Sequence, residues 1–372
     1  MTRLVARRRV SGGRFPRAVG TAGPPLRIGM LAPPWVPVPP PAYGGIENVV
    51  ADLLRALAAR GHHVTLVAAP GSELPGAQVI RVIDELPVVM GHADVDLGHG
   101  LGGYDALEDV DVIVDHTGPA GALLSAWSRA PVLHVCHNRV DGPAGAAFRG
   151  IARRVPELRL VAISHAQRRL GATLPFAGVC PNGIDVDSVP FREHHDGYLA
   201  FVGRMSPDKA PDAAIRIARA AGLPIRVAAK CRDAGERAYF EERVRPLLGP
   251  DVEWLGELSG HDARALMAGA AALVFPIDWP EPFGMVMIEA MAGGTPVLGT
   301  PCGAVPEIVD EGVTGFVRLH EDELAAAAAR LDEIDRRACR ARVRERYSSA
   351  AMADAYERLA RTVATARGLR AG

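Results

Sequence analysis

The sequence has 372 residues, 48% of them hydrophobic, and a formal net charge of -1 at pH 7. This length predicts two domains with separate cores. The near-neutral charge argues against a nucleic-acid-binding protein and against one held on an anionic membrane by charge alone. Five widely spaced cysteines form no C-x-x-C motif, which excludes a disulfide scaffold or a zinc ribbon and favours a reducing cytoplasm. They are Cys136, Cys180, Cys231, Cys302 and Cys339.

The first 25 residues, "MTRLVARRRVSGGRFPRAVGTAGPP", are rich in Arg, Gly and Pro and lack the apolar core of a signal peptide. We expect residues 1–25 to be a disordered basic tail or to precede the true translation start. The alternative is a basic arm that touches phospholipid head groups, as in a peripheral membrane contact, or another anionic partner. No run of about 18 apolar residues occurs, so no transmembrane helix is expected.

The first half of the chain alternates predicted strands and helices. Residues 26–32 form an apolar strand pattern, 44–61 place apolar residues at helical spacing before Gly61, and 63–69 form a second strand pattern. Near-continuous apolar strands joined by a helix indicate a parallel sheet. Further strands are predicted at 111–115, 131–136 and 158–164.

The second half repeats this alternation after a polar linker at 191–197. Strands are predicted at 198–204, 224–230, 252–257, 271–276, 296–300 and 315–319. Helices are predicted at 210–222, 236–249 and 261–270, from about 283, and near 305–309. The fold class is therefore α/β, with two consecutive doubly wound domains at 26–190 and 191–348. Such a chain is expected to hold its main ligand in the cleft between them.

A last helix is predicted within 349–372, over about 349–366. It carries Met352, Tyr356, Leu359 and Val363 on one face. We expect this face to pack back across the domain junction.

Three basic residues follow or end predicted strands of the second half. The strand 198–204 ends at Gly203 and Arg204, and Lys209 follows in the loop before a helix. Lys230 ends the neighbouring strand. Cations at the carboxyl end of a parallel sheet, beside a helix N-terminus, suit a diphosphate. A solvated surface loop is the alternative.

Two carboxylates lie in the apolar stretch "WPEPFGMVMIEAMAGGTPV" at 279–297. Glu281 precedes a predicted helix, and Glu289 lies inside it, too deep to cap its N-terminus. A buried carboxylate needs a partner. Both groups can accept hydrogen bonds from vicinal hydroxyls of a ligand. The alternative is a helix-dipole role for Glu281 and an ion pair with an arginine for Glu289.

The blocks "EPFGMVMIE", with its E-x7-E spacing, and "EAMAGGTPVLGTPCGAVPEIVDEGVTGF" resemble the signature of the retaining nucleotide-sugar glycosyltransferases of family four. The resemblance continues in "YGGIENVVADLLRALAARGHHVTLVA", "VAISHAQRR", "VCPNGID" and "FVGRMSPDKAPDAA" and covers residues 26 to about 360. It implies the GT-B fold, with two Rossmann-like domains facing a cleft. The first domain would lie on the acceptor side, and the second would hold the nucleotide-sugar.

The resemblance also implies roles for individual residues. Arg204 and Lys209 match the diphosphate clamp, and Glu289 would bind the ribose hydroxyls. Glu281 would contact hydroxyls of the transferred sugar. The backbone amides of Phe283, Gly284 and Met285 would lie nearby.

In the first domain, Gly44 and Gly45 match a glycine loop that lets the diphosphate and acceptor approach. His137 matches a histidine near the donor sugar and the reaction centre. Ala210 stands where the family commonly has glycine, and Gly293 where it often has a small Cys or Ser.

Other motifs have weaker interpretations. "GHGLGG" at 98–103 fits G-x-G-x-x-G, but no strand precedes it, so a flexible loop is expected instead of a dinucleotide site. "DVD" at 94–96 and 185–187 resembles a metal motif of a different glycosyltransferase fold and is expected at the surface. His116, at a strand end, is either a hydrogen-bonded structural histidine or an acceptor-site base.

We therefore expect a cytoplasmic, metal-independent glycosyltransferase without a cofactor. It would move a sugar, with retained configuration, from a nucleoside-diphosphate donor to an acceptor hydroxyl, and similarity to family members favours UDP. The acceptor would be a small molecule, a lipid or a glycan, and the first-domain loops at 33–43, 70–110 and 138–155 carry no readable pattern that selects among these classes. The alternatives are a nucleotide-sugar hydrolase or epimerase, or a non-catalytic nucleotide-sugar-binding protein. An oxidoreductase is disfavoured by the lack of a dinucleotide motif after 26–32.

Overall fold

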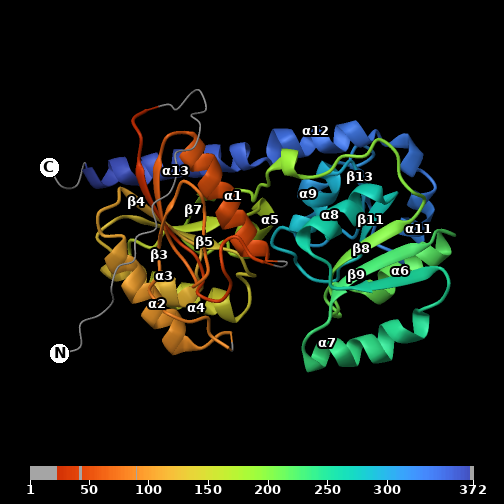
Figure 1. The fold of residues 1–372 in the computed structure, drawn as a ribbon, viewed down its shortest axis with the longest axis horizontal. Coiled ribbons are helices and arrows are strands. Elements are labelled where there is room, and N and C mark those ends of the chain that lie inside the picture. Colours follow the sequence, from red (N-terminus) through yellow and green to blue (C-terminus); the bar gives the residue numbers. More distant parts are fainter. Residues whose placement is uncertain (1–22, 42–43, 89, 369–372) are drawn as a thin grey trace. The chain divides into compact units, whose positions relative to one another are not determined.

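The computed structural model describes residues 23–41, 44–88 and 90–368, and the chain divides into two compact units (Figure 1). Unit 1 comprises Met1–Gly183 and Ser349–Gly372, and unit 2 comprises Ile184–Ser348. The first domain therefore ends at Gly183 instead of residue 190, and the predicted linker at 191–197 is part of unit 2. The predicted tail lies outside the described residues, apart from 23–25.

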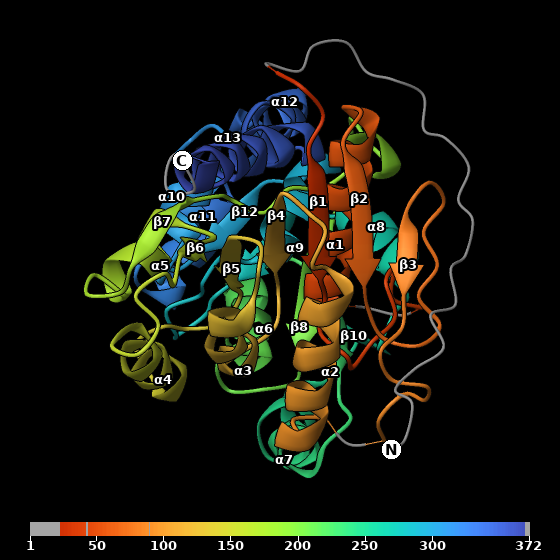
Figure 2. The same cartoon turned by 90° about the vertical axis from the view of Figure 1, so that its left-hand side faces the viewer.

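Unit 1 contains a parallel sheet of seven strands in the order β3-β2-β1-β4-β5-β6-β7 (Figure 2). The strands are β1 Arg27–Leu31, β2 His63–Val67, β3 Gln78–Ile80, β4 Val112–Asp115, β5 Val132–Cys136, β6 Leu160–Ala162 and β7 Phe176–Val179. Ile28 of β1 lies between Val64 and Val112 in register. The central strands are buried, as their continuous apolar sequences predict.

The helices of unit 1 are α1 Gly45–Ala59, α2 Ala93–Ala106, α3 Pro119–Leu124, α4 Pro143–Ala152, α5 His165–Leu170 and α13 Ser349–Gly368. α1 buries Val50, Leu53, Leu54 and Leu57 at the predicted helical spacing. α2 contacts α3, α3 contacts α4, and α1 contacts α13. The helices thereby extend the core on both sides of the sheet.

The C-terminal helix α13 has the predicted apolar face. Met352, Tyr356 and Val363 are buried, and Leu359 is half-buried. The helix is fastened to α1, since Arg60 pairs with Asp354 at 2.6 Å and with Glu357 at 3.2 Å. Although it follows Ser348 of unit 2 along the chain, it belongs to the core of unit 1.

Unit 2 contains a parallel sheet of six strands in the order β10-β9-β8-β11-β12-β13. The strands are β8 Leu199–Arg204, β9 Ile225–Lys230, β10 Val252–Gly256, β11 Ala272–Phe275, β12 Val297–Gly299 and β13 Gly315–Val317. The helices are α6 Pro211–Ala220, α7 Ala234–Tyr239, α8 Gly260–Gly269, α9 Met285–Ala292, α10 Val305–Ile308, α11 Glu321–Ala328 and α12 Arg336–Arg346. Both units therefore have the predicted Rossmann-like α/β fold.

Helix α12 is joined to the rest of unit 2 by two arginines. The buried Arg336 donates to the carbonyl oxygens of Arg192, Ala268 and Ala270 at 2.6–2.9 Å. Arg340 donates to three further carbonyl oxygens, those of Val186, Val189 and Ala292. These hydrogen bonds satisfy backbone carbonyl oxygens whose burial without a donor would lower the stability of the fold.

Three expectations for local structure were wrong. Residues 98–103 lie within α2 and form no flexible loop. The first-domain segments treated as loops contain β3, α2 and α4. The predicted helix at 236–249 continues beyond α7 only as a π-helical turn, Phe240–Val244, and a 3-10 turn, Arg245–Leu247, because Pro246 cannot donate a helical hydrogen bond.

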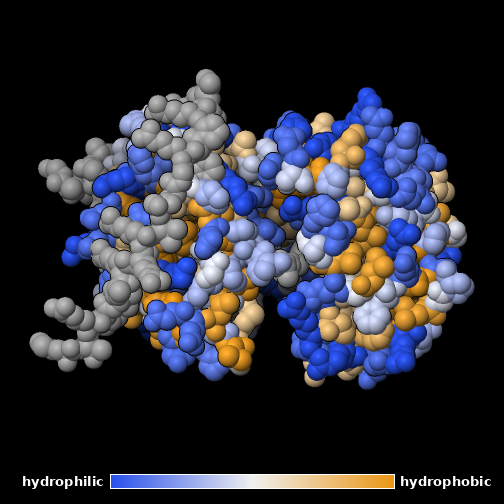
Figure 3. All heavy atoms as spheres, viewed as in Figure 1, coloured by the Kyte–Doolittle hydropathy of each residue, from blue (hydrophilic) through white to orange (hydrophobic). Residues whose placement is uncertain are grey.

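Hydrophilic residues are spread over the visible face of both units, with smaller hydrophobic groups between them (Figure 3). Within the described ranges, no helix combines the length and the apolar character that a membrane crossing requires.

Candidate functional site

The predicted basic residues of unit 2 gather at the carboxyl end of its sheet. Arg204 and Lys230 end the neighbouring strands β8 and β9 and are partners in register. A Cβ added at Gly203 would lie 3.9 Å from the Cβ of Lys209, so the glycine and the lysine are neighbours. Arg204 is exposed and pairs with Asp208 at 2.8 Å. In open α/β sheets, this edge is where ligands bind.

Lys209 has a buried partner in Glu281. Its Nζ donates to Glu281 Oε2, and the two side chains are only 15% and 10% exposed. Trp279 Nε1 donates to the same oxygen at 3.0 Å, and Lys209 Nζ lies 4.5 Å from the centroid of a Trp279 ring. Glu281 is therefore an oriented carboxylate between a cation and an indole. Sequence reasoning missed Trp279, whose position beside two prolines gave no signal of its role.

Backbone geometry holds this cluster closely. Gly303 has φ +58, and a Cβ there would lie 2.3 Å from the backbone N and O of Glu281. Ala304 N donates to Glu281 O at 3.0 Å. Ala210 has φ +52, a conformation that strains an L-residue and suits glycine. This conformation gives a physical reason for the glycine that the family commonly has at this position.

Glu289 lies in α9, which begins at Met285, slightly after the predicted start. Gly284, with φ +86, precedes the helix. The Glu289 side chain is 8% exposed, and Arg264 of α8 donates to its Oε1 from Nε at 3.3 Å and from Nη2 at 3.2 Å. The ion-pair alternative is thus present in the structure. Sequence reasoning did not identify Arg264, because nothing in the pattern of α8 shows that it faces α9.

The two candidate histidines of unit 1 lie together at the ends of β4 and β5. His116 Nδ1 and His137 Nε2 share a hydrogen bond of 2.9 Å, and the rings stack with centroids 5.1 Å apart. Burial lowers the pKa of His116 to about 4. Burial, and then the nearby His116, lowers the pKa of His137 well below its usual value. Both rings are therefore neutral at pH 7.

A buried carboxylate lies beneath this pair. Asp115 accepts hydrogen bonds from the Tyr104 hydroxyl at 2.7 Å, from His134 Nδ1 at 2.9 Å and from the Thr117 hydroxyl at 2.6 Å. Burial opposes its ionisation, but His134 and these donors outweigh burial and hold the pKa of Asp115 at about 2. Asp115 thereby fixes the backbone from which His116 projects. Sequence reasoning missed this network because Tyr104 and His134 lie 11 and 19 residues from Asp115 in the chain.

A cavity of about 270 Å³ in unit 1 is lined by both histidines. Trp35, Ile46 and Phe148 supply apolar walls, and Glu47 and Asp96 supply carboxylates. Gly44 and Gly45 precede Ile46 at the start of α1. A Cβ at Gly44 would lie 2.8 Å from Glu47 Oε2, whereas one at Gly45 would meet nothing within 4 Å. Gly45 therefore leaves the backbone open, whereas a side chain at Gly44 would clash with Glu47 and Pro40.

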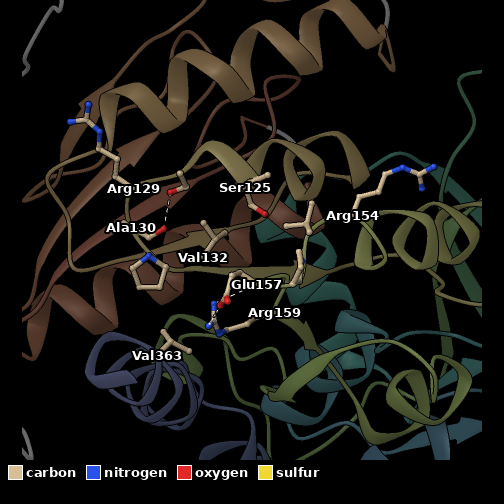
Figure 4. A pocket seen from close by; sticks show the side chains of 13 residues that line it. Ser125, Arg129, Ala130, Val132, Arg154, Glu157, Arg159 and Val363 are labelled. Carbon is tan, nitrogen blue, oxygen red and sulfur yellow. Dashed lines mark hydrogen bonds and ion pairs between the residues drawn. The ribbon is translucent and has the colours of Figure 1, made fainter. Parts of the chain in front are cut away.

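A larger cavity of about 470 Å³ lies elsewhere in unit 1 (Figure 4). Pro131 and Val132, where β5 begins, line this cavity. It therefore lies at the opposite end of that strand from His137. Its charged groups are partly neutralised, since Arg159 pairs with Glu157 at 2.8 Å and Arg129 pairs with Glu108 at 3.0 Å. None of the predicted site residues lines it.

The two Asp-Val-Asp sequences lie in different local structures. Asp94 and Asp96 belong to the first turn of α2, and Asp187 is paired with Arg344 at 2.7 Å. Among the residues that the structure describes, no three His, Cys, Asp or Glu side chains are grouped so that they could hold a metal ion.

Comparison with known proteins identifies both halves of the chain. Residues 43–188 match the family model described as Glycosyltransferase Family 4, and residues 196–333 match the model described as Glycosyl transferases group 1. A phosphatidyl-myo-inositol mannosyltransferase from Mycobacterium leprae is 26% identical over 377 residues, which cover 91% of this chain and 98% of the relative.

Solved structures agree on the architecture. AviGT4, a glycosyltransferase involved in avilamycin A biosynthesis, is 26% identical with a TM-score of 0.69, and the match covers 92% of this chain and 98% of that one. HepE from Anabaena, solved with UDP and glucose, is 19% identical with a TM-score of 0.69 over 90% of this chain and 98% of that one. The neighbours are GT-B glycosyltransferases, so the chain has the GT-B fold.

The lowered pKa of His116 predicts that acidification destabilises the protein. In the unfolded chain this ring is protonated below its ordinary pKa of 6.5, whereas in the folded chain it stays neutral until the pH falls to about 4. The free energy of unfolding should therefore fall as the pH falls through this window, by about 2 kcal/mol between pH 7.5 and pH 5 from this group alone. Urea unfolding at both pH values measures it.

His116→Gln should remove that part of the pH dependence. His261→Gln, at an exposed histidine, is the control and should leave it unchanged. The assignment is wrong if wild type and His116→Gln lose the same unfolding free energy on acidification.

The buried pair of Arg264 and Glu289 predicts a loss of stability on mutation. Arg264→Leu should lower the free energy of unfolding by about 3 kcal/mol, because a buried carboxylate loses its cation. Arg245→Leu, which breaks the exposed pair with Glu241, should cost only about 0.5 kcal/mol. Denaturant unfolding compares the two, and equal small losses would show that the buried pair is unimportant.

Proposed function

We propose that this chain, which belongs to the family 4 glycosyltransferases, moves a sugar from a nucleoside-diphosphate-sugar to an acceptor hydroxyl with retention of configuration, and that the donor is a UDP-sugar. The observation that carries the proposal is the cluster of Lys209, Glu281 and Trp279 at the carboxyl end of the unit 2 sheet. It combines a cation for a phosphate with a fixed carboxylate for sugar hydroxyls. UDP is favoured by likeness to HepE, which was solved with UDP and glucose.

The cations suit a leaving diphosphate. Arg204 is half exposed, and its pair with Asp208 is a surface pair worth at most about 1 kcal/mol. A diphosphate can therefore displace Asp208 at little cost and gain a bidentate guanidinium partner. Lys209 follows β8 and Lys230 ends β9, so both add positive charge at the same edge of the sheet. Preorganised charge at the leaving group is usually the largest contribution to catalysis.

The carboxylates suit the rest of the donor. Glu281 is already oriented by Lys209 and Trp279, so it can accept hydrogen bonds from the transferred sugar without first becoming ordered. Glu289, whose Oε1 is held by Arg264, would bind the ribose hydroxyls. The backbone amides of Phe283, Gly284 and Met285 precede or begin α9 and would donate to donor oxygens.

The reaction we propose is a front-face displacement. No carboxylate in the sequence stands out as a covalent nucleophile, so the leaving phosphate would help to take the proton from the acceptor hydroxyl. His137 would lie near the donor sugar and the reaction centre. His116 and His137 are neutral at pH 7 and can accept or pass a hydrogen bond beside the acceptor. No metal or cofactor enters this scheme, and the cytoplasm is the proposed compartment.

Two other functions use the same donor contacts. A nucleotide-sugar hydrolase or epimerase would convert the donor without an acceptor, and the appearance of free sugar or epimerised donor would reveal it. A non-catalytic binding protein would not need Glu281 or His137, and it would show donor binding without turnover.

Replacing the cations should slow the chemistry. Arg204→Ala and Lys209→Ala should each lower kcat by about 10²–10³-fold, because each removes charge that stabilises the leaving diphosphate. Initial rates of nucleotide release with saturating donor and acceptor measure this. Arg216→Ala, at a half-exposed arginine of α6 that pairs with Asp212 and Glu321, is the matched control. Near-normal kcat in both site variants would refute the electrostatic mechanism.

The choice of nucleotide predicts a difference in ligand-induced stability. Thermal unfolding with UDP, GDP, ADP and dTDP should show the largest increase in Tm with UDP. A ligand at 100 times its Kd adds about 2.7 kcal/mol to the stability of the folded state. A larger increase with another nucleotide would replace UDP in the proposal.

A further inference from the structure

The 270 Å³ cavity of unit 1 carries acidic groups and no arginine or lysine among its described lining residues. Glu47 lies in the first turn of α1 and is only 7% exposed. Asp96 lies in α2 and accepts a hydrogen bond from Trp35. The two acids approach the same cavity from different helices, so its acidity does not come from a single exposed run of charge.

The histidines add no positive charge to this cavity. Burial keeps the pKa of His116 at about 4 and that of His137 far below its usual value, so both rings are neutral at pH 7. His116 Nε2 is buried and has no hydrogen-bond partner among the described residues. A buried nitrogen of this kind is costly unless a ligand supplies the missing bond.

Among the residues that the structure describes, neither Glu47 nor Asp96 forms an ion pair with an arginine, a lysine or a histidine. Burial raises the pKa of both Glu47 and Asp96. The carboxyl of Glu47 accepts a hydrogen bond from its own backbone amide, and it lies against Gly44, where a Cβ would come within 2.8 Å of Glu47 Oε2. A cationic ligand group would favour ionisation of both carboxyls, whereas a phosphate would be repelled by them.

We propose that the acceptor is a small polyol that carries a protonated amine, such as an amino sugar or an aminocyclitol, and that Glu47 and Asp96 select it over a phosphorylated polyol. This inference rests on the proposed function and names the class of acceptor. The Mycobacterium leprae relative is named for phosphatidyl-myo-inositol, a phosphodiester. The cavity of this chain has the opposite charge preference. Its volume, just below the usual range of about 300–1,000 Å³ for ligand sites, suits a single ring.

The test measures binding by charge class. Isothermal titration with the full chain compares glucosamine and 2-deoxystreptamine, which carry ammonium groups, with glucose, myo-inositol and glucose 6-phosphate. We expect the ammonium compounds to bind at least tenfold more tightly than the neutral ones, and the phosphate ester most weakly. Glu47→Gln and Asp96→Asn should each reduce the ammonium preference several-fold. Asp94→Asn, at an exposed acid of the same helix that does not line the cavity, should keep it.

Any other ranking overturns the inference, including no binding by either ammonium compound or equal binding by glucose 6-phosphate. Thermal unfolding of each variant shows whether it is folded, and Asp96→Asn provides a second reading if Glu47→Gln is unstable. Nucleotide binding is measured separately on the same protein. If a nucleotide binds but the ammonium preference is absent, only this inference fails, whereas absence of any nucleotide binding contradicts the proposed function itself.

Discussion

The buried pair of Lys209 and Glu281 is the interaction on which the proposed chemistry of unit 2 depends. Both side chains are largely withdrawn from water, and a charge in such a place is tolerated only with a partner. Trp279 donates to the same carboxylate, and Gly303 permits the close approach of the backbone that carries it. The pair therefore holds a cation and a hydrogen-bond acceptor in fixed positions at the edge of the sheet where α/β folds bind ligands.

Unit 1 also contains a buried carboxylate, which is held by several hydrogen-bond donors. Asp115 lies at the end of β4 and orders Tyr104, His134 and Thr117 around it. The stacked histidines follow directly at the ends of β4 and β5 and remain uncharged. One sheet edge thus presents positive charge beside a fixed carboxylate, and the other presents neutral rings beside an acidic cavity. This contrast would suit the phosphate-bearing donor and the amine-bearing acceptor that we propose.

The sequence predicted the strands of unit 2 and five of the seven strands of unit 1, because buried parallel strands are continuous apolar runs such as 111–115 and 271–276. The ends of these strands located Arg204, Lys230 and His137, whereas the short strands β3 and β7 were missed. It failed where the local pattern is weak: α2 contains four glycines, Gly98, Gly100, Gly102 and Gly103, and it is helical only because the rest of unit 1 packs against it. Partners distant in the chain could not be found either. Arg264 joins the candidate site only through the approach of α8 to α9, and Trp279 only through the turn that brings its indole to both Glu281 and Lys209.

The central claim is retained transfer from a nucleoside-diphosphate-sugar, and the most direct measurement is the anomeric configuration of the product. Proton NMR of the glycoside formed from an α-linked UDP-sugar and a bound acceptor reports it through the coupling constant of the anomeric proton. The account predicts an α-glycoside and the release of one UDP per glycoside formed. A β-glycoside, or free sugar without a glycoside, would contradict it.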